Sequence, residues 1–368
     1  MSLETVVEDI RNEARERAEE IREDGQARAD EITDEAEADA EEILAAKERD
    51  VENRIERERE QPFCLMLSIP DPHGPVNVRP PYDTMFSPDD MPLPDTMFEE
   101  GLPEWADNVR SYGPGKKGSR EEQQARLRRF KALYCGEVKL IDDCVGRILE
   151  TLQRRGILDN TIVVYTTDHG EYMGEHGLMN KNHIYETVYH IPFVMRWPEK
   201  IAGGTVVENM VSTVDFPPTV LGLMGVEGSG REQGRDFSPV LTGATGAWTD
   251  EVFLHHDSLE RAGIFTPEYE LAYVKDSRAV LFDRVNDPEQ TANLIDDPAH
   301  AEARREHLDA LFDATTDAYV AALEAGYTEA TAREITHVQA NFDFYRHGWT
   351  EMMEFPVEEL DAHYDRYA

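Results

Sequence analysis

A carboxylate, an imidazole and a glycine stand together at the end of one apolar run. Asp168, His169 and Gly170 follow the run Ile162–Tyr165, which reads as a buried strand. In open α/β sheets, ligands collect beyond the carboxyl ends of the strands. A hard carboxylate oxygen beside an imidazole nitrogen suits a divalent cation, and glycine allows close approach of the backbone. The segment therefore predicts half of a cation site, with a purely structural turn as the alternative.

Two further side chains could act on an anion near such a cation. Lys181 follows the glycine-bearing loop Gly174–Gly177 and could place its ammonium group against an anionic oxygen; a solvated surface lysine is the alternative. His73 lies in the rigid segment Pro70–Pro75, just beyond another apolar run. Its imidazole could donate a proton to a leaving-group oxygen, whereas the alternative is a histidine that serves only the turn.

In combination, these segments resemble the sulfatase family of the alkaline-phosphatase-like superfamily. The resemblance runs in consistent order from about residue 62 to about residue 300. It covers Pro62-Phe63, Pro70–Pro75, Ile141-Asp-Asp143 with Gly146–Leu149, Asp168–Pro198, Thr213–Thr219, Gly234-Arg-Asp236, Leu281–Asp283, Asn286–Pro288 and Asn293-Leu294.

The resemblance implies roles for particular residues. Asp168 and His169 would be ligands of a divalent cation, with Ca²⁺ expected and Mn²⁺ or Mg²⁺ as alternatives. Lys181 would contact a sulfate oxygen, and His73 would lie near the scissile ester. Four more positions match the family pattern: Asn182 and His183 would face the substrate, while for His176 and Glu186 a packing role is an equal interpretation.

The chain departs from the family pattern in its N-terminal part. Family members have a strand ending in paired aspartates for the same cation, followed by a Cys- or Ser-x-Pro-x-Arg motif whose first residue becomes the formylglycine nucleophile. Neither Ser87-Pro-Asp nor Ser238-Pro-Val fits this motif, and Cys64, Cys135 and Cys144 lack its proline and arginine. The sequence therefore predicts a sulfatase-like chain without its nucleophile, in which catalysis falls by orders of magnitude.

The elements that must position these residues alternate between strand and helix. This order predicts an α/β fold with a mainly parallel sheet sandwiched by helices, over residues 61–244, and a small antiparallel subdomain and tail over 245–368. Strands are expected at 63–69, 161–167, 192–197, 251–255, 269–275 and 279–283, and helices at 120–155, 215–224 and 299–316; residues 70–118 read as a long surface loop.

Residues 1–60 have a different composition. They contain 23 acidic and 10 basic residues, no proline and no aromatic residue. Ile10, Ile21, Ile32 and Ile43 recur every eleven residues, and a second alanine- and valine-rich series has the same step. An eleven-residue period predicts a right-handed coiled-coil helix that needs a partner helix. The segment resembles the N-terminal helix of the E-type peripheral-stalk protein of archaeal A-type ATP synthase; a solitary charged helix is the alternative.

Composition bounds the class of protein. The 368 residues have a net charge of −39, which argues against binding nucleic acid or anionic membranes and favours a halophilic source. The N-terminus lacks the features of a signal peptide, and no apolar run is long enough to span a bilayer, so the expectation is a cytoplasmic protein without membrane insertion.

Three interpretations of function follow. The first is a metal-dependent hydrolase of sulfate esters, acting on a small molecule or a glycan and truncated relative to its family. The second is an interaction protein of the ATP synthase peripheral-stalk type that works through residues 1–60. The third is a chimeric gene product joined near residue 61, where the composition changes abruptly.

Overall fold

The computed structural model describes residues 17, 28, 62–103, 106, 118–181, 184–230, 232–244, 248–256, 261–274, 279–324, 326 and 328. The chain forms two compact units. One consists of 1–87 and 132–154, and the other of 88–131 and 155–368. Of the expected coiled coil, only Arg17 and Arg28 are described, and both are helical and exposed. The coiled coil and the division at residues 60 and 244 stay predictions.

The longest described helix, α3, spans Arg120–Arg154, as the apolar periodicity predicts. It begins at a reciprocal cap: the Ser119 backbone N–H donates to Glu122 Oε2 at 2.7 Å, and the Glu122 N–H donates to Ser119 Oγ at 3.3 Å. It ends just before Gly156, whose φ of 70° is a left-handed conformation that favours glycine. Its residues belong to both units, so it links them along the chain.

Strands β1 (Val163–Thr166) and β2 (Phe193–Arg196) form a two-stranded antiparallel sheet, in which Tyr165 pairs with Val194 and Thr166 with Phe193. The end of this sheet nearest Asp168 is exposed. Val194 is 60% exposed and Tyr165 and Phe193 are each 40% exposed. Among the described residues, each of these strands therefore has one paired edge and one open edge.

Two strand predictions are corrected by this topology. The mainly parallel sheet is not found in the described part of the chain, because β2 returns antiparallel to β1 after a loop and the short helix α4. A parallel return would need a longer crossover element between the strands. Residues 63–69 form no strand and are not buried: Phe63 is 38% and Met66 90% exposed, and Cys64 is exposed too. A strand needs a neighbour to pair with its backbone, and this run has none there.

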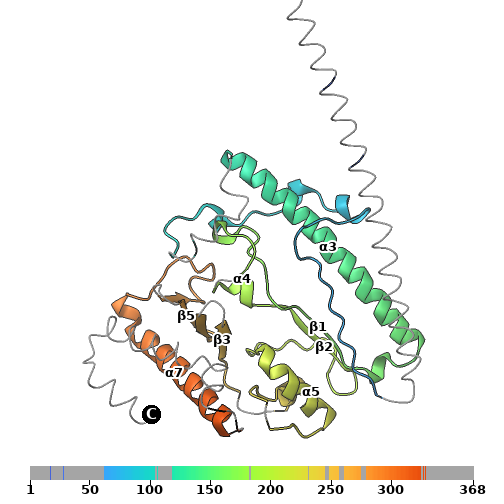
Figure 1. The fold of residues 1–368 in the computed structure, drawn as a ribbon, viewed down its shortest axis with the longest axis vertical. Helices are drawn as coiled ribbons and strands as arrows, with labels where there is room; N and C mark the ends of the chain where they lie inside the picture. Colours follow the sequence, from blue (N-terminus) through green and yellow to red (C-terminus); the bar gives the residue numbers. More distant parts are fainter. Residues whose placement is uncertain are drawn as a thin grey trace, which may run out of the picture. The chain divides into compact units, whose positions relative to one another are not determined.

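The C-terminal sheet is antiparallel, as expected, and its strand order is β3-β4-β5-β6. One strand, β4, lies between two predicted ones and was not expected. The bounds are Val252–His256 for β3, Arg261–Phe265 for β4, Tyr269–Val274 for β5 and Val280–Asp283 for β6. Helix α7 (Ala301–Glu324) runs beside this sheet (Figure 1).

Each face of the C-terminal sheet has its own core. On one face, Ile264, Leu271 and Leu281 pack against Leu308 and Leu311 of α7. On the other, Phe265, Ala272, Val280 and Phe282 pack against the segment that follows β1, including Tyr172, Tyr185 and Val188. Since burial of such side chains contributes about 1.5–3 kcal/mol each, the second core fixes the segment that bears Asp168 to the C-terminal sheet.

Three short helices complete the second unit, together with several 3₁₀ turns. Helix α4 spans Glu186–Tyr189, α5 spans Phe216–Met224 and α6 spans Ser238–Leu241. Helix α5 has prolines in its first turn and is followed by Gly225 with φ of 66°, as its sequence predicts. The 70–118 segment contains only 3₁₀ turns where it is described, at Tyr82–Thr84, Pro88–Asp90 and Asp95–Phe98.

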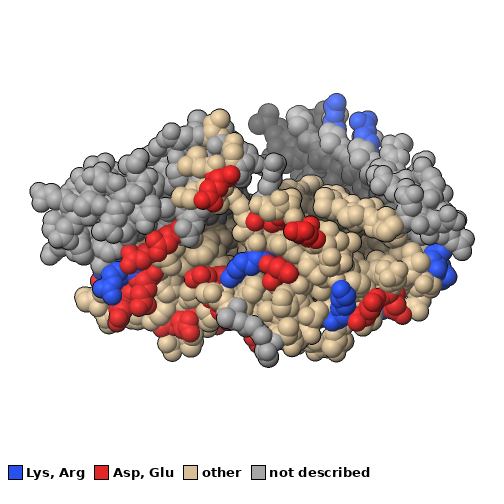
Figure 2. Space-filling model, turned by 90° about the horizontal axis from the view of Figure 1, so that it is seen from below, with Lys and Arg blue, Asp and Glu red and all other residues tan. Residues whose placement is uncertain are grey.

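The acidic charge of the chain is dispersed on the face that Figure 2 shows. Acidic side chains form several small groups there, and lysine or arginine lies beside some of them. No described helix is both long and apolar enough to cross a lipid bilayer.

In the first unit, the segment after His73 packs on α3 through a buried carboxyl group. The Asn77 backbone N–H donates to Glu137 Oε1 at 2.8 Å, and Glu137 is only 2% exposed. Burial raises the pKa of Glu137 to about 6, against the hydrogen bond from Asn77, which lowers it; the nearby charge of Asp71 raises it further. The folded state therefore favours the protonated form.

We expect Glu137→Gln to remove a pH dependence of stability. Because the pKa of Glu137 is higher in the folded chain than the ordinary 4.5, the wild type loses stability as pH rises from about 4.5 through about 6. The variant's free energy of unfolding, relative to wild type, should increase by about 2 kcal/mol between pH 5 and pH 8. Urea unfolding at both pH values measures this. Asp142→Asn, on an exposed face of the same helix, is the control, and an identical pH dependence in wild type and Glu137→Gln would contradict the assignment.

Candidate functional site

Asp168 and His169 lie at the end of β1, where the sequence predicts them. The His169 backbone N–H donates to Asp168 Oδ1 at 3.0 Å, and Thr167 Oγ1 donates to the same oxygen at 3.2 Å. His169 Nδ1 lies 2.8 Å from the Gly170 carbonyl oxygen. Since a carbonyl only accepts, Nδ1 carries the proton and Nε2 keeps its lone pair.

The two outward-facing atoms are placed to share a cation. His169 Nε2 lies 3.5 Å from Asp168 Oδ2. Two ligands at 2.0–2.6 Å from one ion, about 90° apart, are separated by roughly 3–3.5 Å. A backbone carbonyl that fixes the other imidazole nitrogen is the usual support of a ligating histidine. The donor set therefore fits a divalent cation.

The same pair is only part of a coordination shell. Within the described ranges, no group of three or more His, Cys, Asp or Glu side chains is placed to hold one ion. Burial raises the pKa of Asp168, but the charge of His169 and the hydrogen bonds to its carboxylate outweigh burial and lower the pKa overall. Asp168 is thus a carboxylate at neutral pH, as a cation ligand must be.

The loop after Gly170 folds back and brings Lys181 to the same end of β1. The Tyr172 N–H donates to the Asn180 carbonyl at 3.0 Å, and the Asn180 N–H donates to Glu171 Oε1. Burial raises the pKa of Glu171, while the positive charges of Lys181 and His169 both lower it. Glu171 is therefore near both side chains, and the structure brings Lys181 and His169 into one neighbourhood. Asn182 and His183 lie outside the described residues.

His176 serves the loop rather than the cation site. It is 2% exposed, its Nδ1 lies 2.6 Å from Glu99 Oε2, and its backbone N–H donates to Thr96 Oγ1 at 3.0 Å. Its ring stacks on Tyr185 with centroids 3.9 Å apart and an angle of 14° between planes. Of the two interpretations offered by the sequence, packing is the one that these contacts favour.

His73 belongs to the first unit, whereas Asp168, His169 and Lys181 belong to the second. Its backbone N–H donates to the Pro70 carbonyl at 3.0 Å, which closes the predicted turn, and its Nδ1 lies 2.9 Å from the Gly74 carbonyl. The side chain is exposed. Its role beside a scissile ester stays a prediction.

Glu186 is held by two cations at the start of α4. Its Oε1 lies 2.8 Å from Arg284 Nη2 and 3.0 Å from His190 Nδ1. The hydrogen bond from His190 and the bonds and charge of Arg284 lower the pKa of Glu186 to about 2, despite burial. A carboxylate with both oxygens engaged in this way ties α4 to the C-terminal sheet.

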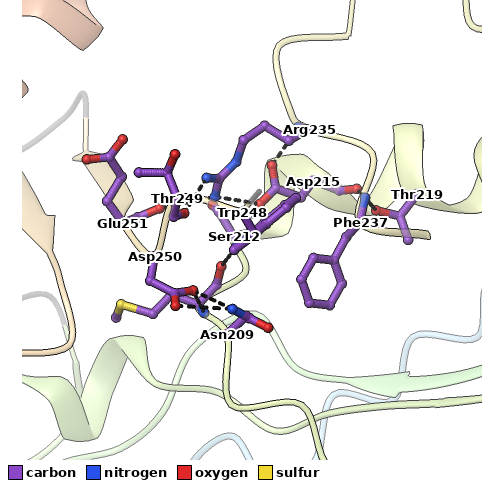
Figure 3. Close-up of polar contacts among 11 residues, drawn as sticks. Asn209, Ser212, Asp215, Thr219, Arg235, Phe237, Trp248, Thr249, Asp250 and Glu251 are labelled. Carbon is purple, nitrogen blue, oxygen red and sulfur yellow. Dashed lines mark hydrogen bonds and ion pairs between the residues drawn. The ribbon is translucent and has the colours of Figure 1, made fainter. Parts of the chain in front are cut away.

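A second cluster of polar residues, centred on Asp215, comes from the other matched motifs (Figure 3). Asp215 accepts from the backbone N–H groups of Arg235 at 2.7 Å and Ser212 at 3.0 Å, and from Arg235 Nη2 at 3.4 Å. The Arg235 guanidinium lies 4.1 Å from the centre of the Trp248 ring. A Cβ at Gly234 would overlap the Val214 carbonyl. These contacts make the cluster a structural clamp between two loops.

Three residues near the site were not anticipated: Glu171, Arg284 and Gln290. Glu171 directly follows Gly170, so its position was readable as soon as the loop was seen to close. Arg284 and Gln290 flank the matched Asn286–Pro288 segment, and nothing in their residue types points to α4, more than 90 positions earlier in the chain.

Three family models match the chain. The sulfatase model covers residues 20–226, and a model described as the C-terminal part of N-sulphoglucosamine sulphohydrolase covers 174–317. A family of unknown function (DUF6149) covers 290–368. The sulfatase match begins well before residue 62, inside the segment for which a coiled coil is predicted. The resemblance of that segment to an ATP synthase stalk helix stays a prediction.

Individual relatives agree with the family models. The chain is 28% identical over 278 residues to the multifunctional alkaline phosphatase superfamily protein PehA of Trinickia caryophylli, covering 67% of this chain and 54% of that protein. It is 29% identical to an N-acetylglucosamine-6-O-sulfatase of Bacteroides thetaiotaomicron, covering 55% and 38%. A Clostridium perfringens arylsulfatase is 26% identical, with 67% and 52% covered. The chain thus spans about half the length, or less, of these curated relatives.

A solved structure supports the same fold. The phosphonate monoester hydrolase of Agrobacterium radiobacter superposes with a TM-score of 0.63 at 25% identity, over 72% of this chain and 59% of that one. The fold is accordingly a mixed α/β fold of the sulfatase and alkaline-phosphatase type. Because the sulfatase model matches more than half of the residues, this chain belongs to the sulfatase family.

Proposed function

We propose that this chain is a metal-dependent sulfatase-family hydrolase of sulfate esters that retains the cation- and anion-binding side of the site and lacks the formylglycine-type nucleophile. The observation that carries the proposal is the Asp168–His169 pair, whose outward-facing Oδ2 and Nε2 atoms lie 3.5 Å apart at the end of β1. The fixed tautomer of His169 and the ionised state of Asp168 support it.

Each side chain has a distinct part in this proposal. Asp168 and His169 hold the cation, for which we propose Ca²⁺, with Mn²⁺ or Mg²⁺ as alternatives, because a carboxylate is a hard ligand. The bound cation would supply positive charge against the ester oxygens. Lys181 adds a second positive charge for a sulfate oxygen, and Glu171 limits where that ammonium group can lie. We propose His73 as the proton donor to the leaving group, with Asn182 and His183 facing the substrate.

The proposed substrates are sulfate esters of small molecules or glycans, by analogy with the relatives named as arylsulfatase and N-acetylglucosamine-6-O-sulfatase. A second candidate is a phosphonate monoester, which the 0.63 TM-score with a phosphonate monoester hydrolase favours. Both substrates present a tetrahedral anion to the same pair of positive charges, so one assay can compare them.

The test is turnover and binding with the purified chain. We expect Ca²⁺-dependent binding of inorganic sulfate by calorimetry, and release of nitrophenol from 4-nitrophenyl sulfate that stays orders of magnitude below that of an intact sulfatase. Chelator and the Lys181→Ala variant are the controls, and 4-nitrophenyl phenylphosphonate tests the second candidate. Turnover at the rate of an intact sulfatase would refute the loss of the nucleophile. Sulfate binding that is indifferent to both cation and Lys181 would refute the site.

A further inference from the structure

The backbone of the ligand segment rests on helix α4. The Gly170 N–H donates to the Val188 carbonyl at 2.6 Å, and Thr187 Oγ1 donates to the Glu171 carbonyl at 3.5 Å. A Cβ at Gly170 would overlap the Thr187 carbonyl oxygen, so the two backbones are as close as glycine permits. Because the Gly170 carbonyl also fixes His169, a shift of α4 is transmitted to the proposed cation ligand.

Helix α4 does not hold this position by itself. It has only four residues, too few for a helix that is stable alone. Its first backbone N–H, that of Glu186, donates to Gln290 Oε1 at 2.9 Å. The Glu186 side chain meets Arg284, whose Nη1 also donates to the Thr266 carbonyl. The start of α4 is therefore fastened to the C-terminal subdomain.

Gln290 is itself fixed on both sides. Its side chain is buried, with the residue 4% exposed, and its Nε2 donates to Glu270 on β5, which has no exposed surface. Its φ of 53° is a left-handed conformation that is uncommon for glutamine and costs of order 1 kcal/mol or more. Such a conformation persists where the surroundings determine it, and here the amide group uses both its donor and its acceptor.

We propose that Gln290 is a positioning residue for the Asp168–His169 pair, acting through α4 and Gly170. The amide of Gln290 sets the first backbone N–H of α4, α4 sets Gly170 through Val188, and Gly170 orients the imidazole. In this arrangement the C-terminal subdomain determines the geometry of a cation site at the end of β1. The inference rests on the proposed cation-binding function.

The experiment compares Gln290→Ala with Thr291→Ala in the full chain. The second variant removes an exposed hydrogen bond to Asp287 in the same loop and leaves the amide contacts intact. Calorimetric titration with Ca²⁺ should show about tenfold weaker binding for Gln290→Ala, the lower end of the 10–100-fold range for groups that support metal ligands. Hydrogen exchange at the Gly170 amide should become faster in the same variant. Thr291→Ala should match wild type in both measurements.

Two further variants separate positioning from folding. If Gln290→Ala fails to fold, Gln290→Asn keeps an amide in a residue that tolerates positive φ but is too short to reach both partners, and the same losses are expected. The double exchange Glu270→Gln with Gln290→Glu reverses the donor and acceptor between β5 and the loop while keeping an acceptor for the Glu186 N–H. We expect it to restore the Gly170 exchange rate and most of the Ca²⁺ affinity.

The outcomes distinguish this inference from the proposed function. A wild-type chain that binds no Ca²⁺ would overturn the cation site, and the Gly170 exchange rate would then decide the positioning claim alone. Wild-type Ca²⁺ affinity and Gly170 exchange in a folded Gln290→Ala variant would overturn the positioning claim while leaving the cation site intact.

Discussion

Replacing Asp168 by alanine should weaken Ca²⁺ binding by at least about 100-fold, the upper end of what loss of a supporting group costs, because a direct ligand is removed. Asp168 is one of two side chains whose free donor atoms converge at the end of β1. Its side chain is 82% exposed, so its removal should leave the stability of the chain without Ca²⁺ within about 0.5 kcal/mol of wild type. Calorimetric titration together with thermal unfolding in chelator measures both effects.

Asp159→Ala is a matched control for this experiment. Asp159 is equally exposed, at 81%, and it forms a 2.6 Å ion pair with Arg196, away from the end of β1. Ca²⁺ binding that resists Asp168→Ala but falls with Asp159→Ala would show that acidic surface charge, and not the Asp168–His169 pair, attracts the ion. His169→Ala should reproduce the loss seen with Asp168→Ala.

Replacing Asp215 by alanine should destabilise the folded chain by about 3–5 kcal/mol. Its carboxylate is 2% exposed and accepts from two backbone N–H groups and from Arg235. The variant leaves those N–H groups without their acceptor and leaves the Arg235 guanidinium without its counter-charge (Figure 3). Urea unfolding at constant salt measures the difference.

The same Asp159→Ala variant supplies the comparison, since it removes an aspartate from an exposed pair with arginine. Its cost should be less than about 1 kcal/mol. Equal losses from the two variants would mean that the buried hydrogen bonds of Asp215 contribute nothing beyond a surface ion pair. Ca²⁺ affinity in the folded fraction of Asp215→Ala should be unchanged if the cluster is only structural.

Local patterns in the sequence were sufficient for several elements. The apolar period and the Ser119 and Gly156 boundaries located α3 to within one or two residues, and the Pro-Pro start located α5. The β4 strand was missed because Arg261–Phe265 contains an arginine and a glycine, and burial of all five residues leaves no alternation to read. The strand expected at 63–69 was wrong because its pairing partner is not part of a local pattern.

The candidate site shows the same division. Asp168 and His169 could be placed at a strand end from the apolar run alone, and Lys181 joined them through a loop whose glycines are visible in the sequence. The antiparallel return of β2 and the contact of Gln290 with α4 depend on long-range packing. Neither the left-handed conformation of Gln290 nor its partner 104 residues away is encoded in its residue type.

The open β1–β2 ribbon has a consequence for how this protein behaves in concentrated solution. Val194, Phe193 and Tyr165 present an apolar surface next to unpaired backbone groups, which is the usual starting point for strand-by-strand association between copies. A net charge of −39 opposes that encounter by mutual repulsion. The repulsion vanishes near the isoelectric point of about 4.6, so acidic precipitation of this chain would begin at the ribbon that carries its candidate site.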